Sequence, residues 1–132
     1  MAFSILLADD ETHILRAAEI KFTRSGYRVR CASDGQEAWE MIEAERPDIL
    51  ITDCQMPRLD GLALARRIRS SPAVSDLPIV MLTAKGYELR HDKVEQELSL
   101  KAVLAKPFSP RELVARVEEI LHQRLAPQSA AV

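Results

Sequence analysis

Five side chains suited to chemistry stand at the ends of four short apolar runs. Each run is typical of a buried strand, and the residues that end or follow them are Asp9 and Asp10, Asp53, Thr83, and Lys106. The carboxyl ends of parallel strands share one edge of a sheet, and the ligands of such sheets gather at that edge. The spacing therefore predicts three carboxylates, one hydroxyl and one ammonium group at a single site.

The three carboxylates predict a bound cation. Acids packed this closely repel one another and have raised pKa values unless a cation neutralises them. Oxygen ligands favour a hard divalent ion, and magnesium in particular binds through one or two carboxylates while keeping room for waters and phosphate oxygens. We therefore expect Mg2+ to be held by Asp9 and Asp10, with Asp53 beside it.

A carboxylate next to such an ion can act as a nucleophile toward phosphorus. The metal screens the approach of two anions and stabilises charge on the phosphoryl oxygens. Asp53 is the candidate for this role. Lys106 would neutralise one phosphoryl oxygen and Thr83 would donate a hydrogen bond to another, so these two side chains are expected to form a clamp once phosphate is present.

Strands and helices alternate along the whole chain. Apolar runs at 4–8, 27–32, 48–52, 77–83 and 102–105 are separated by segments of helical period, which predicts the order βαβαβαβαβα. Right-handed crossovers between the strands then produce a single doubly wound α/β sheet with helices on both faces. The run at 27–32 alternates polar and apolar residues and is predicted to lie at the edge of the sheet.

Capping residues mark the helices. Helices are predicted over 11–24, from Asp34 to an exit at Pro47, from Gly61 onward, over 87–99, and from Ser109 to about Leu125. Gly26 is expected to end the first helix in a left-handed conformation. The helix over 87–99 carries few apolar residues, so we expect it to be weakly anchored.

Two features of the second and third helices are given structural interpretations. Trp39 falls on the apolar side of its helix and is predicted to be packed. Arg66, Arg67 and Arg69 fall largely on the outer side of theirs and are predicted to form a solvated face, with a docking site as the alternative.

Length and composition suit one ordinary globular domain. We place this domain at 1–125, with a flexible tail over 126–132. The formal net charge of -2 gives no reason to expect nucleic acid or an anionic membrane as a partner. No apolar run approaches the ~20 residues of a membrane span and no signal-peptide pattern opens the chain, so the expected location is the cytoplasm. Cys31 and Cys54 are expected to be reduced thiols.

Four segments resemble the motifs of response-regulator receiver domains of two-component or phosphorelay signalling. They are Leu6 to Glu11, Asp48 to Gly61, Pro78 to Ala84 and Lys106 to Pro110. The resemblance covers Ile5 to about Leu125 and implies a (βα)5 flavodoxin-like sandwich with a parallel sheet of order 2-1-3-4-5. It also implies a signalling domain that assists its own phosphorylation and dephosphorylation, and not an enzyme.

The resemblance further implies roles for individual residues. Asp53 would be phosphorylated in a magnesium-dependent reaction by a histidine kinase or a histidine phosphotransfer protein, and Thr83 and Lys106 would bind the phosphoryl group. The implied metal ligands are Asp9, Asp10, Asp53 and the backbone carbonyl of Gln55.

Phosphorylation in this family changes the face formed by the fourth helix, fifth strand and fifth helix, and thereby the downstream protein partner. The corresponding switch residues here are Thr83, Ala84, Val103 and Pro107. The family commonly carries Tyr or Phe at the position of Val103, so the swing of an aromatic ring is not assumed for this chain. We expect a monomer or a weak dimer.

Other interpretations of these residues stay open. Asp9 and Asp10 could serve only to cap the first helix. A phosphohydrolase with an aspartyl nucleophile would resemble its family in an Asp-x-Asp motif, whereas Asp9-Asp10 is followed here by Glu11-Thr12. A module of the same fold could bind partners without phosphorylation. A nucleotide-binding module is disfavoured because no Gly-rich phosphate loop follows the first strand.

Overall fold

The computed structural model describes residues 3–83, 96–106 and 108–125. Five parallel strands form one sheet of order β2-β1-β3-β4-β5, which confirms the predicted fold and the edge position of β2. The strands are β1 Ser4–Ala8, β2 Arg28–Ala32, β3 Ile49–Asp53, β4 Ile79–Thr83 and β5 Ala102–Ala105. The helices are α1 Thr12–Arg24, α2 Gly35–Ala44, α3 Gly61–Arg69 and α6 Pro110–Leu125.

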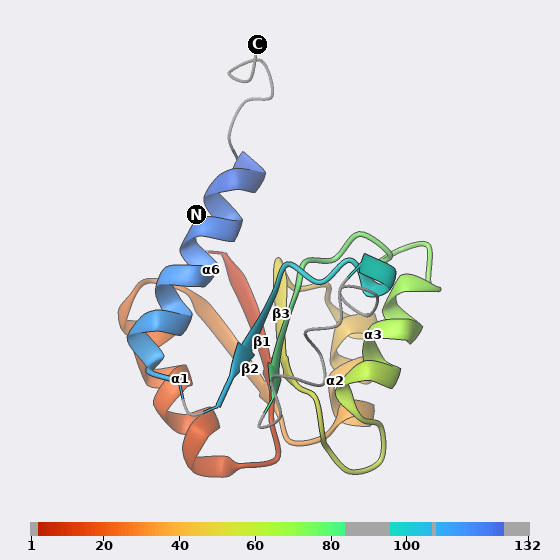
Figure 1. Ribbon diagram of the computed structural model, residues 1–132, viewed down its shortest axis with the longest axis horizontal. Coiled ribbons are helices and arrows are strands. Elements are labelled where there is room, and N and C mark those ends of the chain that lie inside the picture. Colours follow the sequence, from red (N-terminus) through yellow and green to blue (C-terminus); the bar gives the residue numbers. More distant parts are fainter. Residues whose placement is uncertain (1–2, 84–95, 107, 126–132) are drawn as a thin grey trace.

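The helices form a layer on each face of the sheet. Figure 1 shows α1 and α6 on one side of the strands and α2 and α3 on the other. Each side has its own apolar cluster, with Phe22 and Val117 in the first and Ile42 and Leu64 in the second. Every residue of β3 and β4 is buried, as expected for central strands that are covered on both faces.

The helix ends follow the predicted capping chemistry. The Asp34 carboxylate accepts a hydrogen bond from the backbone N–H of Glu37 at 2.8 Å, and the Ser109 hydroxyl accepts one from that of Glu112 at 3.0 Å. Gly26 has a φ of 95° and ends α1 in the left-handed region, as predicted. These local signals set where each helix begins or ends, and therefore where each strand meets the edge of the sheet.

The prediction of an outward arginine face was wrong for Arg69. Its guanidinium is partly buried and donates hydrogen bonds to four backbone carbonyl oxygens, those of Leu98, Ser75, Leu77 and Ser99, at 2.6 to 3.2 Å. The side chain lies at the end of α3 and reaches the two segments that precede β4 and β5. Arg66 and Arg67 are exposed, and the Arg67 guanidinium stacks 5.5 Å from the ring of the packed Trp39.

Some predictions lie outside the described residues. Most of the expected fourth helix, the switch residues Ala84 and Pro107, and the tail over 126–132 are among them. At the end of the expected fourth helix, residues 96–98 are helical and Leu98 is buried. Within the described part of the chain, no helix combines the length and the apolar character that crossing a membrane requires.

Candidate functional site

The predicted site residues meet at the carboxyl edge of the sheet, which is the lower edge in Figure 1. Asp9 directly follows β1, Asp53 ends β3, Thr83 ends β4 and Lys106 directly follows β5. The backbone N–H of Lys106 donates to the carbonyl oxygen of Thr83 at 2.8 Å. The parallel register of four neighbouring strands therefore brings together residues that are up to 97 positions apart in sequence.

Three carboxylates form a compact cluster. One oxygen from each of Asp9, Asp10 and Asp53 lies within 4.8 Å of the others. Asp9 and Asp53 are buried, with 2% and 6% of their surface exposed, while Asp10 is exposed. Burial and the charge of Asp9 raise the pKa of Asp53, and Lys106 opposes that rise. The cluster is therefore electrostatically unfavourable unless a cation is added.

The oxygen atoms of Asp9 fit a metal ligand. Its Oδ1 accepts a hydrogen bond from the backbone N–H of Glu11 at 2.9 Å. Its Oδ2 is buried and forms an ion pair with Nζ of Lys106 at 2.9 Å. A buried carboxylate oxygen needs a partner of this kind, and a hard divalent cation among the three carboxylates would serve as one. Asp9, Asp10 and Asp53 are the side chains that would hold it.

Lys106 is already engaged within the acid cluster. Its ammonium nitrogen lies 2.7 Å from Glu11, 2.9 Å from Asp9 and 3.3 Å from Asp53, and its side chain is only 9% exposed. Burial lowers the pKa of Lys106, but the carboxylates of Glu11, Asp9 and Asp53 outweigh burial and raise the pKa above its ordinary value. The ammonium therefore stays charged and neutralises part of the cluster in the absence of phosphate.

Glu11 is the residue of this site that sequence reasoning missed. Its pKa is lowered by the hydrogen bond and charge of Lys106. Glu11 occupies the N-cap position of α1, but its side chain makes no capping hydrogen bond. The signal that could have found it is a third acid directly after Asp9 and Asp10, at a position where Glu is a poor cap.

The loop after β3 is held close to the site by two glycines. The N–H of Gly61 donates to the carbonyl oxygen of Cys54 at 2.8 Å, and a Cβ at Gly61 would overlap the carbonyl oxygen of Asp53. A Cβ at Gly35 would likewise overlap the carbonyl oxygen of Leu59. Any larger residue would push this loop outward. The loop carries Gln55, whose backbone carbonyl is the fourth predicted metal ligand.

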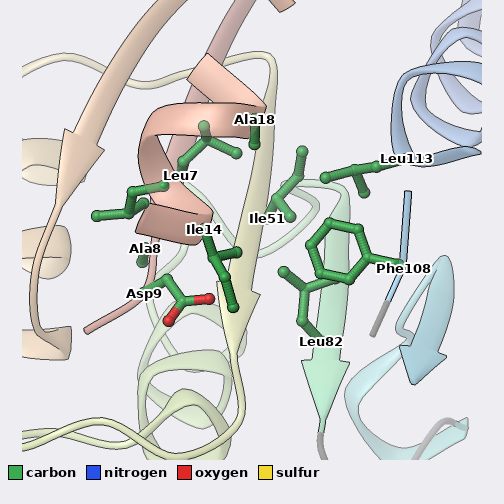
Figure 2. Close-up of a pocket in the computed structure, with 10 residues that line it drawn as sticks. Leu7, Ala8, Asp9, Ile14, Ala18, Ile51, Leu82, Phe108 and Leu113 are labelled. Carbon is green, nitrogen blue, oxygen red and sulfur yellow. The ribbon is translucent and has the colours of Figure 1, made fainter. Parts of the chain in front are cut away.

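Apolar side chains form the wall behind Asp9. Figure 2 shows Leu7, Ile14, Ile51 and Phe108 around a small cavity, with the Asp9 carboxylate at its margin. The cavity has a volume of about 10 Å³, which is near the least that holds one water molecule. The inner side of the acid cluster is therefore poorly solvated, and this strengthens the electrostatic interactions at the edge.

The chain belongs to the family of response regulator receiver domains. The model of this family matches residues 5–118. The chain is 43% identical over 120 residues to the alkaline phosphatase synthesis transcriptional regulatory protein PhoP of Bacillus subtilis, a match that covers 90% of this chain and 48% of PhoP. The chain therefore spans about half the length of that relative. Receiver domains are signalling domains.

Solved structures show the same fold with a similar sequence. A putative response regulator from Chloroflexus aurantiacus matches with a TM-score of 0.83 and 38% identity, over 92% of this chain and 99% of that one. The receiver domain of sensor histidine kinase PA1611 from Pseudomonas aeruginosa matches with a TM-score of 0.78 and 32% identity, over 90% and 97%. That structure is described with a magnesium ion coordinated in the active site cleft.

Proposed function

We propose that this receiver domain accepts a phosphoryl group on Asp53 in a magnesium-dependent reaction. The donor is a phosphohistidine of a histidine kinase or a histidine phosphotransfer protein. The observation that carries the proposal is the buried Asp53 carboxylate, with Asp9 and Asp10 oxygens within 4.8 Å and the Lys106 ammonium at 3.3 Å. A bound Mg2+ would screen the negative charge of the incoming phosphoryl group.

The residues of the site have separate tasks in this reaction. An oxygen of Asp53 forms a bond to phosphorus while the bond between phosphorus and one nitrogen of the donor imidazole breaks; with the other ring nitrogen protonated in the donor, an acyl phosphate and a neutral histidine result. Thr83 ends β4, the strand next to that of Asp53, and Lys106 directly follows β5, one strand further along; both side chains would bind phosphoryl oxygens. Asp9, Asp10 and the carbonyl of Gln55 would complete the metal site.

The new charge is proposed to alter the contacts of the protein. A phosphoryl group adds a charge of about -1.5 to -2. Lys106 would neutralise part of this charge and Thr83 would donate a hydrogen bond to a phosphoryl oxygen. These residues end β4 and directly follow β5, and Val103 on β5 is partly buried against the apolar cluster of Leu64 and Leu98. A shift at the carboxyl edge would therefore be transmitted through β5 to the side of the sheet that this cluster covers, without an aromatic ring at position 103. The downstream partner is proposed to be a protein, because a net charge of -2 does not favour nucleic acid.

The acceptor residue is tested by mass. The chain is incubated with acetyl phosphate and Mg2+, and its intact mass is compared with those of Asp53→Asn and Asp48→Asn. Asp48 lies just before the same strand and accepts a hydrogen bond from the backbone N–H of Ser4 at 2.7 Å, so it is a matched control. We expect the natural chain and Asp48→Asn to gain one phosphoryl group and Asp53→Asn to gain none.

The labelling experiment and a phosphatase assay together separate the competing functions. An interaction module that works without phosphate would gain no mass under conditions that label an established receiver domain, and the proposal would then fail. A phosphohydrolase would turn over p-nitrophenyl phosphate at an enzyme-like rate. We expect stoichiometric labelling and no such turnover.

A further inference from the structure

Glu11 directs its carboxylate to Lys106 instead of capping its helix. The oxygen Oε1 of Glu11 accepts a hydrogen bond from Nζ of Lys106 at 2.7 Å, the shortest of the three ion pairs that this ammonium group forms with the described residues. The backbone N–H of Glu11 also donates to the Asp9 carboxylate, so Glu11 is held in the site through both its backbone and its side chain. Its position at the N-cap of α1 is not used for capping. The contact with Lys106 is therefore its evident role.

Lys106 contacts two of the carboxylates that would bind a divalent metal ion. Its nitrogen lies 2.9 Å from Oδ2 of Asp9 and 3.3 Å from Oδ2 of Asp53. Both acids belong to the group of three whose oxygens lie within 4.8 Å of one another. A divalent ion bound by these oxygens would lie close to the ammonium group, and two cations repel strongly at short range. Lys106 therefore has to withdraw from Asp9 and Asp53 when these acids hold a divalent ion.

Glu11 offers Lys106 a position to which it can withdraw. The side chain of Glu11 is 46% exposed, against 3% for Asp9 and 9% for Asp53, so it lies on the more solvated side of the ammonium group. The ammonium group can keep its hydrogen bond to Glu11 while it gives up its ion pairs with Asp9 and Asp53. Among the contacts of the described residues, removal of Glu11 would leave Lys106 with only Asp9 and Asp53 as ion-pair partners.

We propose that Glu11 is a positioning residue that retains Lys106 when its ammonium group leaves Asp9 and Asp53, and that it thereby favours Mg2+ binding by these acids. The inference rests on the proposed function, because it takes the three acids to be the magnesium site. Retention by Glu11 also keeps the ammonium group within the site, from where it can donate to an oxygen of a phosphoryl group on Asp53.

Magnesium affinity without any phosphoryl donor tests the inference. Isothermal titration calorimetry of the full chain is expected to give a dissociation constant about threefold higher for Glu11→Gln, a size typical of one exposed ion pair. The same substitution in a Lys106→Met background is expected to leave the affinity unchanged. Glu119→Gln, which removes an exposed acid on α6 that pairs with Arg116, is the matched control for loss of charge.

Glu11→Asp separates the contact from the charge. Asp is a strong N-cap residue, so its shorter carboxylate is expected to accept hydrogen bonds from α1 and to leave Lys106. The magnesium affinity should then fall about as much as in Glu11→Gln, with no change in net charge. The inference is overturned if both Glu11 variants bind Mg2+ like the natural chain, or if Glu11→Gln weakens binding equally with and without Lys106. Failure of the natural chain itself to bind Mg2+ would instead overturn the proposed function along with it.

Discussion

Lys106 and Arg69 are two long cationic side chains that each contact several oxygen atoms, but the oxygens differ in kind. Lys106 lies 2.7 to 3.3 Å from three carboxylates at the carboxyl edge of the sheet. Arg69 donates at 2.6 to 3.2 Å to four backbone carbonyls in the segments that precede β4 and β5. Lys106 is therefore surrounded by negatively charged groups, and Arg69 by neutral carbonyl dipoles.

This difference separates an exchangeable contact from a permanent one. Burial lowers the pKa of Arg69, with partial opposition from Asp76, whereas the carboxylates around Lys106 raise its pKa despite burial. A carboxylate can exchange one cation for another, because a metal ion satisfies its charge as well as an ammonium group does. A carbonyl at the end of a loop has no such substitute within the fold. Arg69 is therefore expected to stabilise the fold, and Lys106 to respond to ligands.

Arg69→Met is expected to have the largest effect on stability. It removes four hydrogen bonds from a charged group, so the free energy of unfolding should fall by about 3 kcal/mol. Arg66→Met, an exposed residue on the same helix, is the matched control and should change stability by less than about 0.5 kcal/mol. Urea denaturation measures both. Equal effects of the two substitutions would remove the distinction between the two regions.

Lys106→Met is expected to have a smaller effect that depends on magnesium. In the presence of a chelator the loss of the cation beside Asp9 and Asp53 should cost about 2 kcal/mol of stability, because the site is buried only at the edge of the fold. Saturating Mg2+ should restore most of this loss by binding to the folded state. The measurement is urea denaturation with EDTA and with Mg2+. Arg69→Met should show no comparable rescue, and a rescue of that variant would contradict the comparison.

Asp53→Asn is expected to stabilise the metal-free protein slightly. Like charges that lie within 4.8 Å of one another, as in this cluster, repel by roughly 3 kcal/mol at an effective dielectric constant of 20. Lys106 offsets part of this repulsion, so we expect a gain of about 1 kcal/mol. The pKa of Asp53 is raised in the folded state, so its ionised form is disfavoured there.

The pH dependence of that difference gives its sign. The natural chain loses stability relative to Asp53→Asn as the pH rises from the ordinary pKa of 3.8 through the raised value in the fold. The gain from the substitution should therefore be full at neutral pH and should vanish toward pH 3.8. Thermal unfolding in EDTA across this range measures it. A difference that grows as the pH falls would contradict the raised pKa.

The fold and most of the site could be predicted from local patterns. Continuous apolar runs indicated β3 and β4, and capping residues such as Asp34 and Ser109 marked helix starts that the structure confirms. Parallel strands then placed Asp9, Asp53 and Lys106 at one edge. The prediction succeeded because each of these signals is contained in a few neighbouring residues and one rule of topology.

The amino-acid sequence by itself determined which residues reach the carboxyl edge, because strand and helix periodicity decide where each strand ends. Only the tertiary structure decided the partners of the two long cations. Lys106 meets Glu11 across 95 positions, and Arg69, predicted to face solvent, meets Leu98 across 29. A helical pattern gives the direction in which a side chain leaves the backbone. It does not indicate where a long flexible side chain ends, which depends on the charges and carbonyl oxygens that other segments place within its reach.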